Sequence, residues 1–241
     1  MTALVPLLKT FRTTAQTERE KGTYFERLVK TYLQQEPSYQ DLFGGQVYLW
    51  EEWRKHCMQQ GQPDPGVDAG IDLVAVEATK DNPRIFAVQA KFYAEDAKIS
   101  KAAGIDSFLS AMGKAPFTNG LLVLTTFKAT EHVINLVQGR DKPVNIISLS
   151  DLEASLIDWS QYLPEAPAVT LRSKKALRPH QQSALNATLT GFARESRGKL
   201  IMACGTGKTF TSLKIAEAYA GAGKRVLFLV PSLSLLSQTL T

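Results

Sequence analysis

The sequence predicts an α/β protein made of two successive units. Its 241 residues exceed the about 150 that are typical of one domain. Residues 1–160 carry a net charge of −3 and residues 161–241 carry +8, so the second unit is the better suited to polyanions. The sign changes at Leu163-Pro164-Glu165-Ala166-Pro167, a stretch typical of a linker. We therefore expect a complete unit over 1–160, a linker over 161–176 and an incomplete unit over 177–241.

The composition excludes several classes of protein. Hydrophobic residues make up 44% and charged residues 21% of the chain, which favours a buried core over disorder. No apolar run approaches the roughly 20 residues of a membrane-spanning helix. The N-terminus lacks the basic region and cleavage site of a secretion signal, so we expect a cytoplasmic protein. Cys57 and Cys204 are the only cysteines, and they indicate neither a disulfide framework nor a zinc site.

The first unit reads as an αβββαβ core. Thr17 and Glu20 fit a capping box, and the apolar stripe from Phe25 to Leu33 predicts an amphipathic helix. The residues 79–83 are typical of a turn, so the runs on either side of them form a hairpin. The predicted elements after the helix are strands at Gln46–Trp50, Ile71–Ala78 and Arg84–Tyr93, a helix at Ile105–Met112, a strand at Leu121–Phe127, a helix at Thr130–Val137, a strand at Val144–Leu149 and a helix at Leu152–Trp159 capped by Ser150-Asp151.

Polar side chains interrupt the two strands of that hairpin. Asp72 begins the first strand, and Gln89 and Lys91 interrupt the second. The side-chain period of two places Gln89 and Lys91 on one face and their apolar neighbours on the other. Polar groups inside an apolar sheet are costly unless they pair with each other or with a metal ion.

This arrangement is suited to a magnesium site. The Asp72 carboxylate, the Gln89 amide oxygen and the backbone carbonyl of Ala90 are the hard oxygen ligands that Mg²⁺ prefers. Such an ion lowers the pKa of water and neutralises charge on a phosphate, while the Lys91 ammonium orients the nucleophile or stabilises the transition state. The arrangement therefore indicates phosphodiester hydrolysis. The alternative is a solvated Gln and Lys edge with an aspartate that merely begins a strand.

Gly70-Ile71-Asp72 followed by Gln89-Ala90-Lys91 resembles the D…QxK form of the PD-(D/E)xK nuclease motif of Mrr-type restriction endonucleases. The resemblance implies a restriction-endonuclease-like fold and a metal-dependent nuclease. In that family the preceding helix often contributes a glutamate. Gly22-Thr23-Tyr24-Phe25-Glu26 resembles that helix signature, which adds Glu26 to the candidate catalytic residues. The departure from the general pattern is Gln89 in place of an acid, which removes one negative charge from the metal site.

The second unit carries a phosphate-binding loop. Lys199–Ala203 predicts a strand, Cys204-Gly205-Thr206-Gly207-Lys208-Thr209 a glycine-rich loop and Phe210–Tyr219 a helix. In such a loop, backbone N–H groups and the helix N-terminus face the phosphates, Lys208 reaches the β- and γ-phosphates and the Thr209 hydroxyl binds Mg²⁺. Met202 stands where the simplest pattern has its first glycine.

The surrounding segments resemble superfamily 2 helicases. Leu177-Arg178-Pro179-His180-Gln181 looks like their adenine-reading segment, the glycine-rich loop like motif I, and the strand at Val226–Val230 with the serine-rich stretch after it like motif Ia. The resemblance implies the start of a RecA-like parallel α/β motor that binds ATP with Mg²⁺. The residues it assigns to the nucleotide are Gln181, Gly205, Thr206, Gly207, Lys208 and Thr209.

A nuclease followed by a motor resembles the N-terminus of type ISP restriction-modification enzymes. The resemblance implies double-stranded DNA and ATP as partners, methyltransferase and target-recognition domains further along a longer chain, and a second nuclease copy for double-strand cleavage. It predicts an ATP-dependent restriction endonuclease that is not a membrane protein. Two alternatives stay open: a helicase-nuclease of DNA repair or recombination, and an inactive nuclease fold that serves as a DNA-binding or docking module.

Overall fold

The computed structural model describes residues 3–67, 70–79, 81–93, 104–126, 131–165, 169–172, 176–203, 205–221 and 224–229, with the side chains of 131 and 132 left out. The chain divides into two compact units, Met1–Ser173 and Lys174–Thr241. No helix of the described residues is long and apolar enough to cross a membrane.

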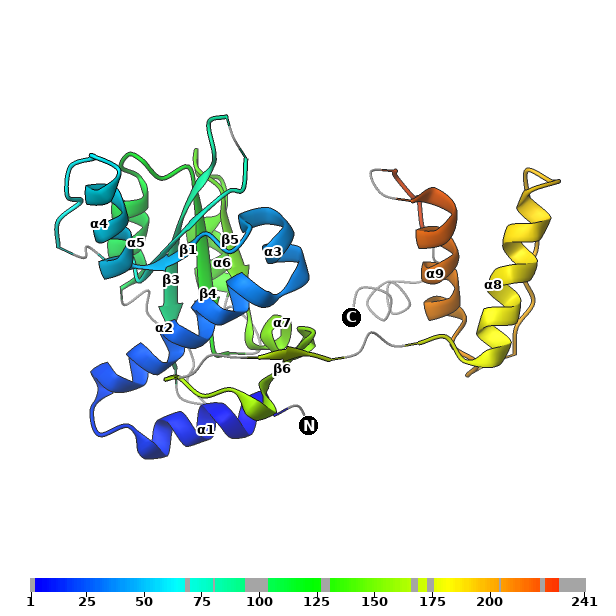
Figure 1. Cartoon of the computed structure of the whole chain (residues 1–241), viewed down its shortest axis with the longest axis horizontal. Helices are drawn as coiled ribbons and strands as arrows, with labels where there is room; N and C mark the ends of the chain where they lie inside the picture. Colours follow the sequence, from blue (N-terminus) through cyan, green and yellow to red (C-terminus); the bar gives the residue numbers. More distant parts are fainter. Residues whose placement is uncertain are drawn as a thin grey trace. The chain divides into compact units, whose positions relative to one another are not determined.

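A mixed five-stranded sheet forms the centre of the first unit (Figure 1). Its strands follow one another in space in the order of the chain. The first three pair antiparallel, and the third, fourth and fifth pair parallel. Helices connect the parallel pairs, as parallel connections require. The strands are β1 (Val47–Leu49), β2 (Leu73–Val76), β3 (Ile85–Lys91), β4 (Asn119–Leu124) and β5 (Val144–Ile147).

One face of the sheet is covered by α1 (Leu4–Thr14), α2 (Glu18–Gln35), α3 (Pro37–Phe43) and α7 (Leu149–Ala154). The predicted stripe of α2 is buried there, and the Thr17 side chain accepts a hydrogen bond from the N–H of Glu20 at 3.1 Å, as the capping box predicts. The buried residues that pack between these helices and the sheet include Phe25, Leu28, Leu73, Val88 and Val123.

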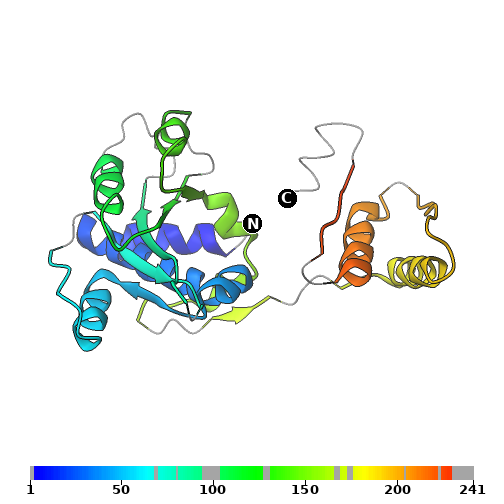
Figure 2. The same cartoon turned by 90° about the horizontal axis from the view of Figure 1, so that it is seen from above.

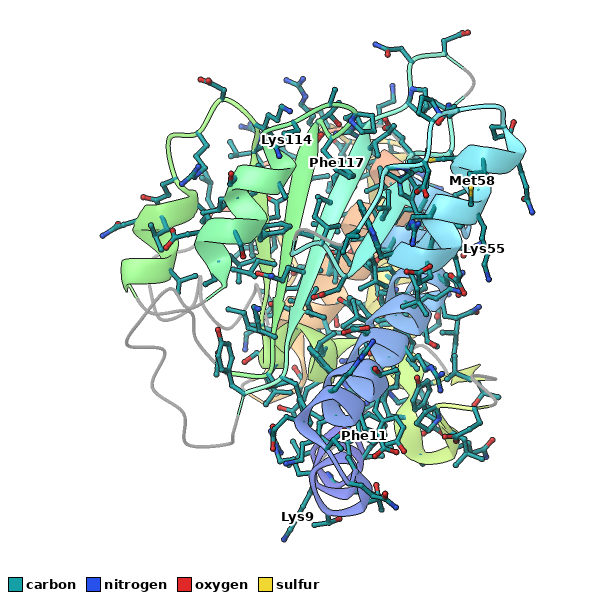
Figure 3. The ribbon with its side chains drawn as sticks, turned by 90° about the vertical axis from the view of Figure 1, so that its left-hand side faces the viewer. Lys9, Phe11, Lys55, Met58, Lys114 and Phe117 are labelled. Atoms are coloured by element: carbon teal, nitrogen blue, oxygen red, sulfur yellow. The ribbon has the colours of Figure 1, made fainter. Side chains whose placement is uncertain are left out.

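The other face is covered by α4 (Trp50–Gln59), α5 (Ile105–Met112) and α6 (Glu131–Val137). In Figure 3, α4, which carries Lys55 and Met58, and α5, which lies next to Lys114, stand on this side of the strands. Val74 and Ala87 point toward this face. Because side chains alternate along a strand, Gln89 and Lys91 share the face of Ala87.

The predicted αβββαβ order is confirmed, with additions. The helices α1 and α3 have no counterpart among the predicted elements, and α4 begins at Trp50, the last residue of a predicted strand. The expected helix at Leu152–Trp159 is wrong: α7 begins earlier, because Ser148 caps it through reciprocal bonds with Asp151.

A short two-stranded sheet lies at the C-terminal end of the first unit. The strand β6 (Ile157–Asp158) pairs antiparallel with β7 (Thr170–Leu171), and the 3₁₀ turn η1 (Trp159–Gln161) follows β6. The segment expected to be a linker, 161–176, therefore contributes a strand that packs back on the first unit.

The second unit contains α8 (Pro179–Phe192) and α9 (Lys208–Ala220), which lie side by side in Figures 1 and 2. The Phe192 and Tyr219 rings meet at 5.0 Å between centroids. The strands predicted at Lys199–Ala203 and Val226–Val230 are absent from the described residues, which end at 229 in this region. A strand requires a hydrogen-bonded neighbour, and neither segment has one among these residues.

The turn between β2 and β3 is closed by an ion pair. The Arg84 guanidinium donates to both carboxylate oxygens of Glu77, with Nε–Oε2 2.9 Å and Nη2–Oε1 2.6 Å. The backbone N–H of Glu77 also donates to the Arg84 carbonyl at 3.0 Å. The hydrogen bonds from Arg84 lower the pKa of Glu77 to about 2.

Replacing Glu77 by Gln should reduce the acid sensitivity of the first unit. Because the folded pKa of Glu77 lies below that of the unfolded chain, its contribution is present above about pH 4.5 and is lost as the pH falls toward 2. The urea midpoint of the wild type should therefore fall more steeply over this range than that of Glu77→Gln. Glu18→Gln, at a carboxylate whose side chain is 89% exposed, is the control. Parallel slopes for wild type and Glu77→Gln would refute this role of the pair.

Candidate functional site

Asp72 and Gln89 face each other across the β2–β3 pair. The antiparallel register pairs Leu73 with Val88, and one further step places Asp72 opposite Gln89. Opposed residues of an antiparallel pair point to the same face, so both side chains lie on the side covered by α5. The structure thus brings together the predicted carboxylate and the predicted amide from two neighbouring strands.

The Gln89 side chain is buried, with 2% of its surface exposed. Its amide nitrogen donates to the Gly70 carbonyl at 2.9 Å. Because a carbonyl can only accept, the amide nitrogen must face Gly70, and this fixes the orientation of the amide oxygen. That oxygen is buried and has no hydrogen-bond partner among the described residues. An unsatisfied buried acceptor costs about 1–3 kcal/mol, so this oxygen is a ready ligand for a cation or a donor.

The Asp72 carboxylate is fixed by the backbone of β3. Its Oδ2 atom accepts a hydrogen bond from the N–H of Ala90 at 2.7 Å. The Asp72 main chain is also tied on both sides, since its N–H donates to the Val88 carbonyl and its carbonyl accepts from Trp50, each at 3.0 Å. Hydrogen bonds to a carboxylate are stronger than those between neutral groups. The contact with Ala90 therefore places the carboxylate beside the chain segment that also carries Gln89 and Lys91.

Lys91 ends β3 on the same face as Gln89, and its ammonium lies against Gly104, the residue before α5. A Cβ atom added at Gly104 would stand only 2.7 Å from Lys91 Nζ. Gly104 also has φ +86°, a conformation that L-residues rarely adopt. This contact was not foreseen, because a glycine before a helix ordinarily signals no more than a cap.

Glu26 lies on α2, the helix that covers the opposite face of the sheet. The neighbouring Phe25 ring stacks on Phe92, with 5.4 Å between centroids and 19° between planes. Phe92 directly follows Lys91, so α2 passes over the end of β3 at this point. Glu26 is half-buried on this helix.

The oxygen groups that the sequence predicts as metal ligands are of the kind that suits a hard divalent cation. One carboxylate, one amide oxygen without a partner and the nearby Ala90 carbonyl are oxygen ligands, the type that Mg²⁺ takes while keeping several waters. The parts of the chain that the structure describes hold no group of three or more His, Cys, Asp and Glu side chains that could bind a metal. A site at this edge would therefore depend on amide and carbonyl oxygens as well as on Asp72.

The loop predicted to bind phosphate has glycines in the left-handed backbone region. Gly205 and Gly207 have φ +75° and +80°, and α9 begins directly at Lys208. The Thr206 hydroxyl and the Lys208 ammonium both donate to the Ala203 carbonyl, at 2.7 and 3.0 Å. Thr209 is the second residue of α9. In this conformation the lysine expected to reach phosphates is bonded to its own loop.

Gln181 connects α8 to the same loop. Its amide oxygen accepts from the N–H of Arg178 at 2.9 Å, and its amide nitrogen donates to the Thr206 carbonyl at 3.0 Å. A cavity of about 160 Å³ lies between these groups and Phe210. Both ends of the amide to which the helicase resemblance gave the adenine-reading role are thus bonded to backbone groups. Gly207 is needed here, because a Cβ atom at this position would stand 2.4 Å from the Gln181 amide nitrogen.

Comparison with solved structures finds an ATP-dependent type ISP restriction-modification enzyme, LlaBIII, bound to DNA. The two chains are 37% identical, the TM-score is 0.69, and the match covers 97% of this chain. It covers 14% of the LlaBIII chain, so this chain spans a small part of that enzyme's length. The predicted resemblance to type ISP enzymes is confirmed. A comparison with curated proteins finds no match.

Two family models also match the chain. The model of the type III restriction enzyme res subunit matches residues 174–241, the part that holds the loop predicted to bind phosphate. The restriction endonuclease model matches residues 34–169, a range that contains Asp72, Gln89 and Lys91. The restriction endonuclease model thus matches more than half of this chain. The chain therefore belongs to the restriction endonuclease family.

Proposed function

We propose that the first unit is a metal-dependent endonuclease that hydrolyses DNA phosphodiester bonds, within a type I-like, ATP-dependent restriction-modification enzyme. Membership of the restriction endonuclease family and the likeness to a DNA-bound type ISP enzyme support this setting. Double-stranded DNA is the proposed substrate. Methyltransferase and target-recognition domains are proposed to belong to the same longer protein, and a second nuclease copy to cut the second strand.

The observation that carries the proposal is the buried amide oxygen of Gln89, which has no partner among the described residues. It belongs to a side chain whose orientation is fixed by Gly70. Beside it stands the Asp72 carboxylate, fixed by Ala90. An oxygen left without a donor next to an ordered carboxylate is what a divalent cation would satisfy.

The residues of this chain would divide the work between binding and charge stabilisation. Asp72, Gln89 and the Ala90 carbonyl would hold a Mg²⁺ ion. When bound, such an ion supplies Lewis acidity, which stabilises charge on the phosphate and lowers the pKa of water. The Lys91 ammonium would donate to the phosphate oxygen on which negative charge develops, as a preoriented cation in a partly buried site. Glu26 is a further candidate, from the helix that passes over the end of β3.

The second unit is proposed to begin the ATP-dependent motor. Lys208 and the N–H groups at the start of α9 would contact the phosphates, and Thr209 would contact the Mg²⁺ ion that accompanies ATP. Gly205, Thr206 and Gly207 shape the loop. For Lys208 to reach a phosphate, its bond to the Ala203 carbonyl must break. For Gln181 to read adenine, its bonds to Arg178 and Thr206 must open as well.

Asp72→Asn should abolish nicking while leaving the fold intact. The amide oxygen of Asn can still accept from the Ala90 N–H, but the site loses its carboxylate charge. We expect the rate of Mg²⁺-dependent nicking of supercoiled plasmid to fall at least about a hundredfold, the scale of losing a charge-stabilising group. Asp41→Asn, at an exposed carboxylate on α3, should nick as the wild type does. Equal nicking by wild type and Asp72→Asn, with purity controlled, would remove Asp72 from the reaction.

Gly104→Ala should displace the Lys91 ammonium, because the new Cβ atom would meet Nζ at 2.7 Å. A misplacement of about 1 Å can cost on the order of a hundredfold in rate, so we expect nicking to slow at least about tenfold. Gly139→Ala is the matched control, since Gly139 has φ +68° but nothing within 4 Å of a Cβ atom. Both variants carry backbone strain, and only the first should lose activity. Equal activity of the two would show that the position of Lys91 is unimportant.

A further inference from the structure

The backbone hydrogen bonds between β3 and β4 end at Lys91. Beyond this point, the side chain of Thr125 binds the backbone that follows β3. The last backbone rung runs from the N–H of Thr125 to the Lys91 carbonyl, at 3.2 Å. The Thr125 hydroxyl oxygen then accepts a hydrogen bond from the N–H of Tyr93 at 2.8 Å, and the hydroxyl donates to the Tyr93 carbonyl at 3.1 Å. Thr125 is 1% exposed, so water does not compete for these bonds. One residue thus binds the backbone on both sides of Phe92.

An arginine binds the same peptide from the other side of the sheet. Arg12 Nη2 donates to the Tyr93 carbonyl at 2.9 Å, and the guanidinium lies over the Phe92 ring, 4.7 Å from its centroid. No carboxylate pairs with Arg12 in the described part of the chain. Its charge is therefore satisfied by a carbonyl and an aromatic face, in a half-buried position where such contacts are stronger than at the surface.

The helix that carries Arg12 is itself firmly docked. Phe11, the preceding residue, is buried and lies 5.5 Å from the Tyr24 ring, 6.5 Å from Phe92 and 6.3 Å from Tyr162. In Figure 3, Phe11 points into the body of the unit and Lys9 points away from it. The helix α1 precedes residues 34–169, the range matched by the restriction endonuclease model. The contact thus comes from outside the matched part.

We propose that Arg12 and Thr125 form a clamp on the Tyr93 backbone that positions Lys91 for the reaction. The Tyr93 clamp, made of these two residues, fixes the backbone that directly follows Lys91. It thereby fixes the orientation of the Lys91 side chain at the end of β3. Neither residue touches substrate: both act through the backbone as positioning residues. This inference rests on the proposed nuclease function.

Removing either half of the clamp should slow cleavage without weakening DNA binding. Thr125→Val keeps the shape but leaves the Tyr93 N–H without its acceptor, and Arg12→Met keeps much of the length but loses the donor. At saturating Mg²⁺, the single-turnover rate constant for plasmid nicking by the 241-residue chain should fall at least about tenfold in each, the scale expected for a misplaced group. The dissociation constant for DNA should not change. Thr125→Ser, which keeps the hydroxyl, should restore most of the rate.

Matched variants separate the clamp from general effects of substitution. Lys9→Met removes a cation from the exposed side of α1, and Thr10→Val removes an exposed hydroxyl from the same helix. Both should nick at the wild-type rate. Melting temperatures of all variants identify any that lose activity by unfolding.

Amide hydrogen exchange of the same proteins tests the clamp without relying on activity. In Thr125→Val the Tyr93 amide should exchange at least about tenfold faster than in wild type, because its hydrogen bond is lost. The amides of β3 before Lys91 should be unchanged. Thr10→Val should match the wild type throughout.

The outcomes distinguish this inference from the proposed function. Unchanged exchange at Tyr93 in Thr125→Val would overturn the clamp. Faster exchange with an unchanged nicking rate would overturn its positioning role. A wild-type chain that does not nick with Mg²⁺ or Mn²⁺ would contradict the proposed function, and the exchange result would still decide whether the clamp exists.

Discussion

Gln89 and Asp72 stand opposite each other on paired strands, and the candidate site depends on this pairing. The register is fixed because a shift of one residue would turn Val88 to the opposite face of the sheet and would place the polar Gln89 side chain among the apolar side chains that pack against α2. With the register fixed, the Gln89 amide is trapped against the Gly70 carbonyl, and its oxygen is left buried without a partner among the described residues. Leaving that oxygen without a partner destabilises the fold, and the apolar packing on both faces of the sheet offsets this loss of free energy. Such a locally unfavourable group is typical of a functional site.

The rest of the first unit maintains the position of these groups. At one end of the hairpin, the Glu77–Arg84 pair ties the strands together. At the other end, α5 begins beside Lys91, and Gly104 leaves room for the ammonium. The sheet thus presents Lys91 and the proposed metal ligands Asp72 and Gln89 on one face, while α1 and α2 pack on the opposite face. The second unit has its own polar centre, in which Gln181 and Lys208 are bonded to backbone carbonyls.

Local sequence patterns predicted the parts of the fold that depend on local physics. Alternation along β3 placed Gln89 and Lys91 on one face, and the capping box at Thr17 gave the start of α2. The helix α1 was missed although Leu4, Leu8 and Phe11 form a helical stripe, because it has neither the side-chain cap nor the acidic first turn that marked the start of α2. Contacts between distant residues, such as Lys91 with Gly104 or Tyr93 with Thr125, have no signature in either local sequence. The two strands expected in the second unit are not formed among the residues that the structure describes there, because an apolar run becomes a strand only beside a hydrogen-bonded partner.

The central claim is that Asp72 and Gln89 together hold a divalent cation. Anomalous diffraction from crystals of this chain soaked in Mn²⁺ tests it most directly. The account predicts a peak within about 2.3 Å of Asp72 Oδ and Gln89 Oε1, the reach of a hard cation to its oxygen ligands. Density for water alone between these two atoms, at Mn²⁺ concentrations that fill other sites in the crystal, would contradict it.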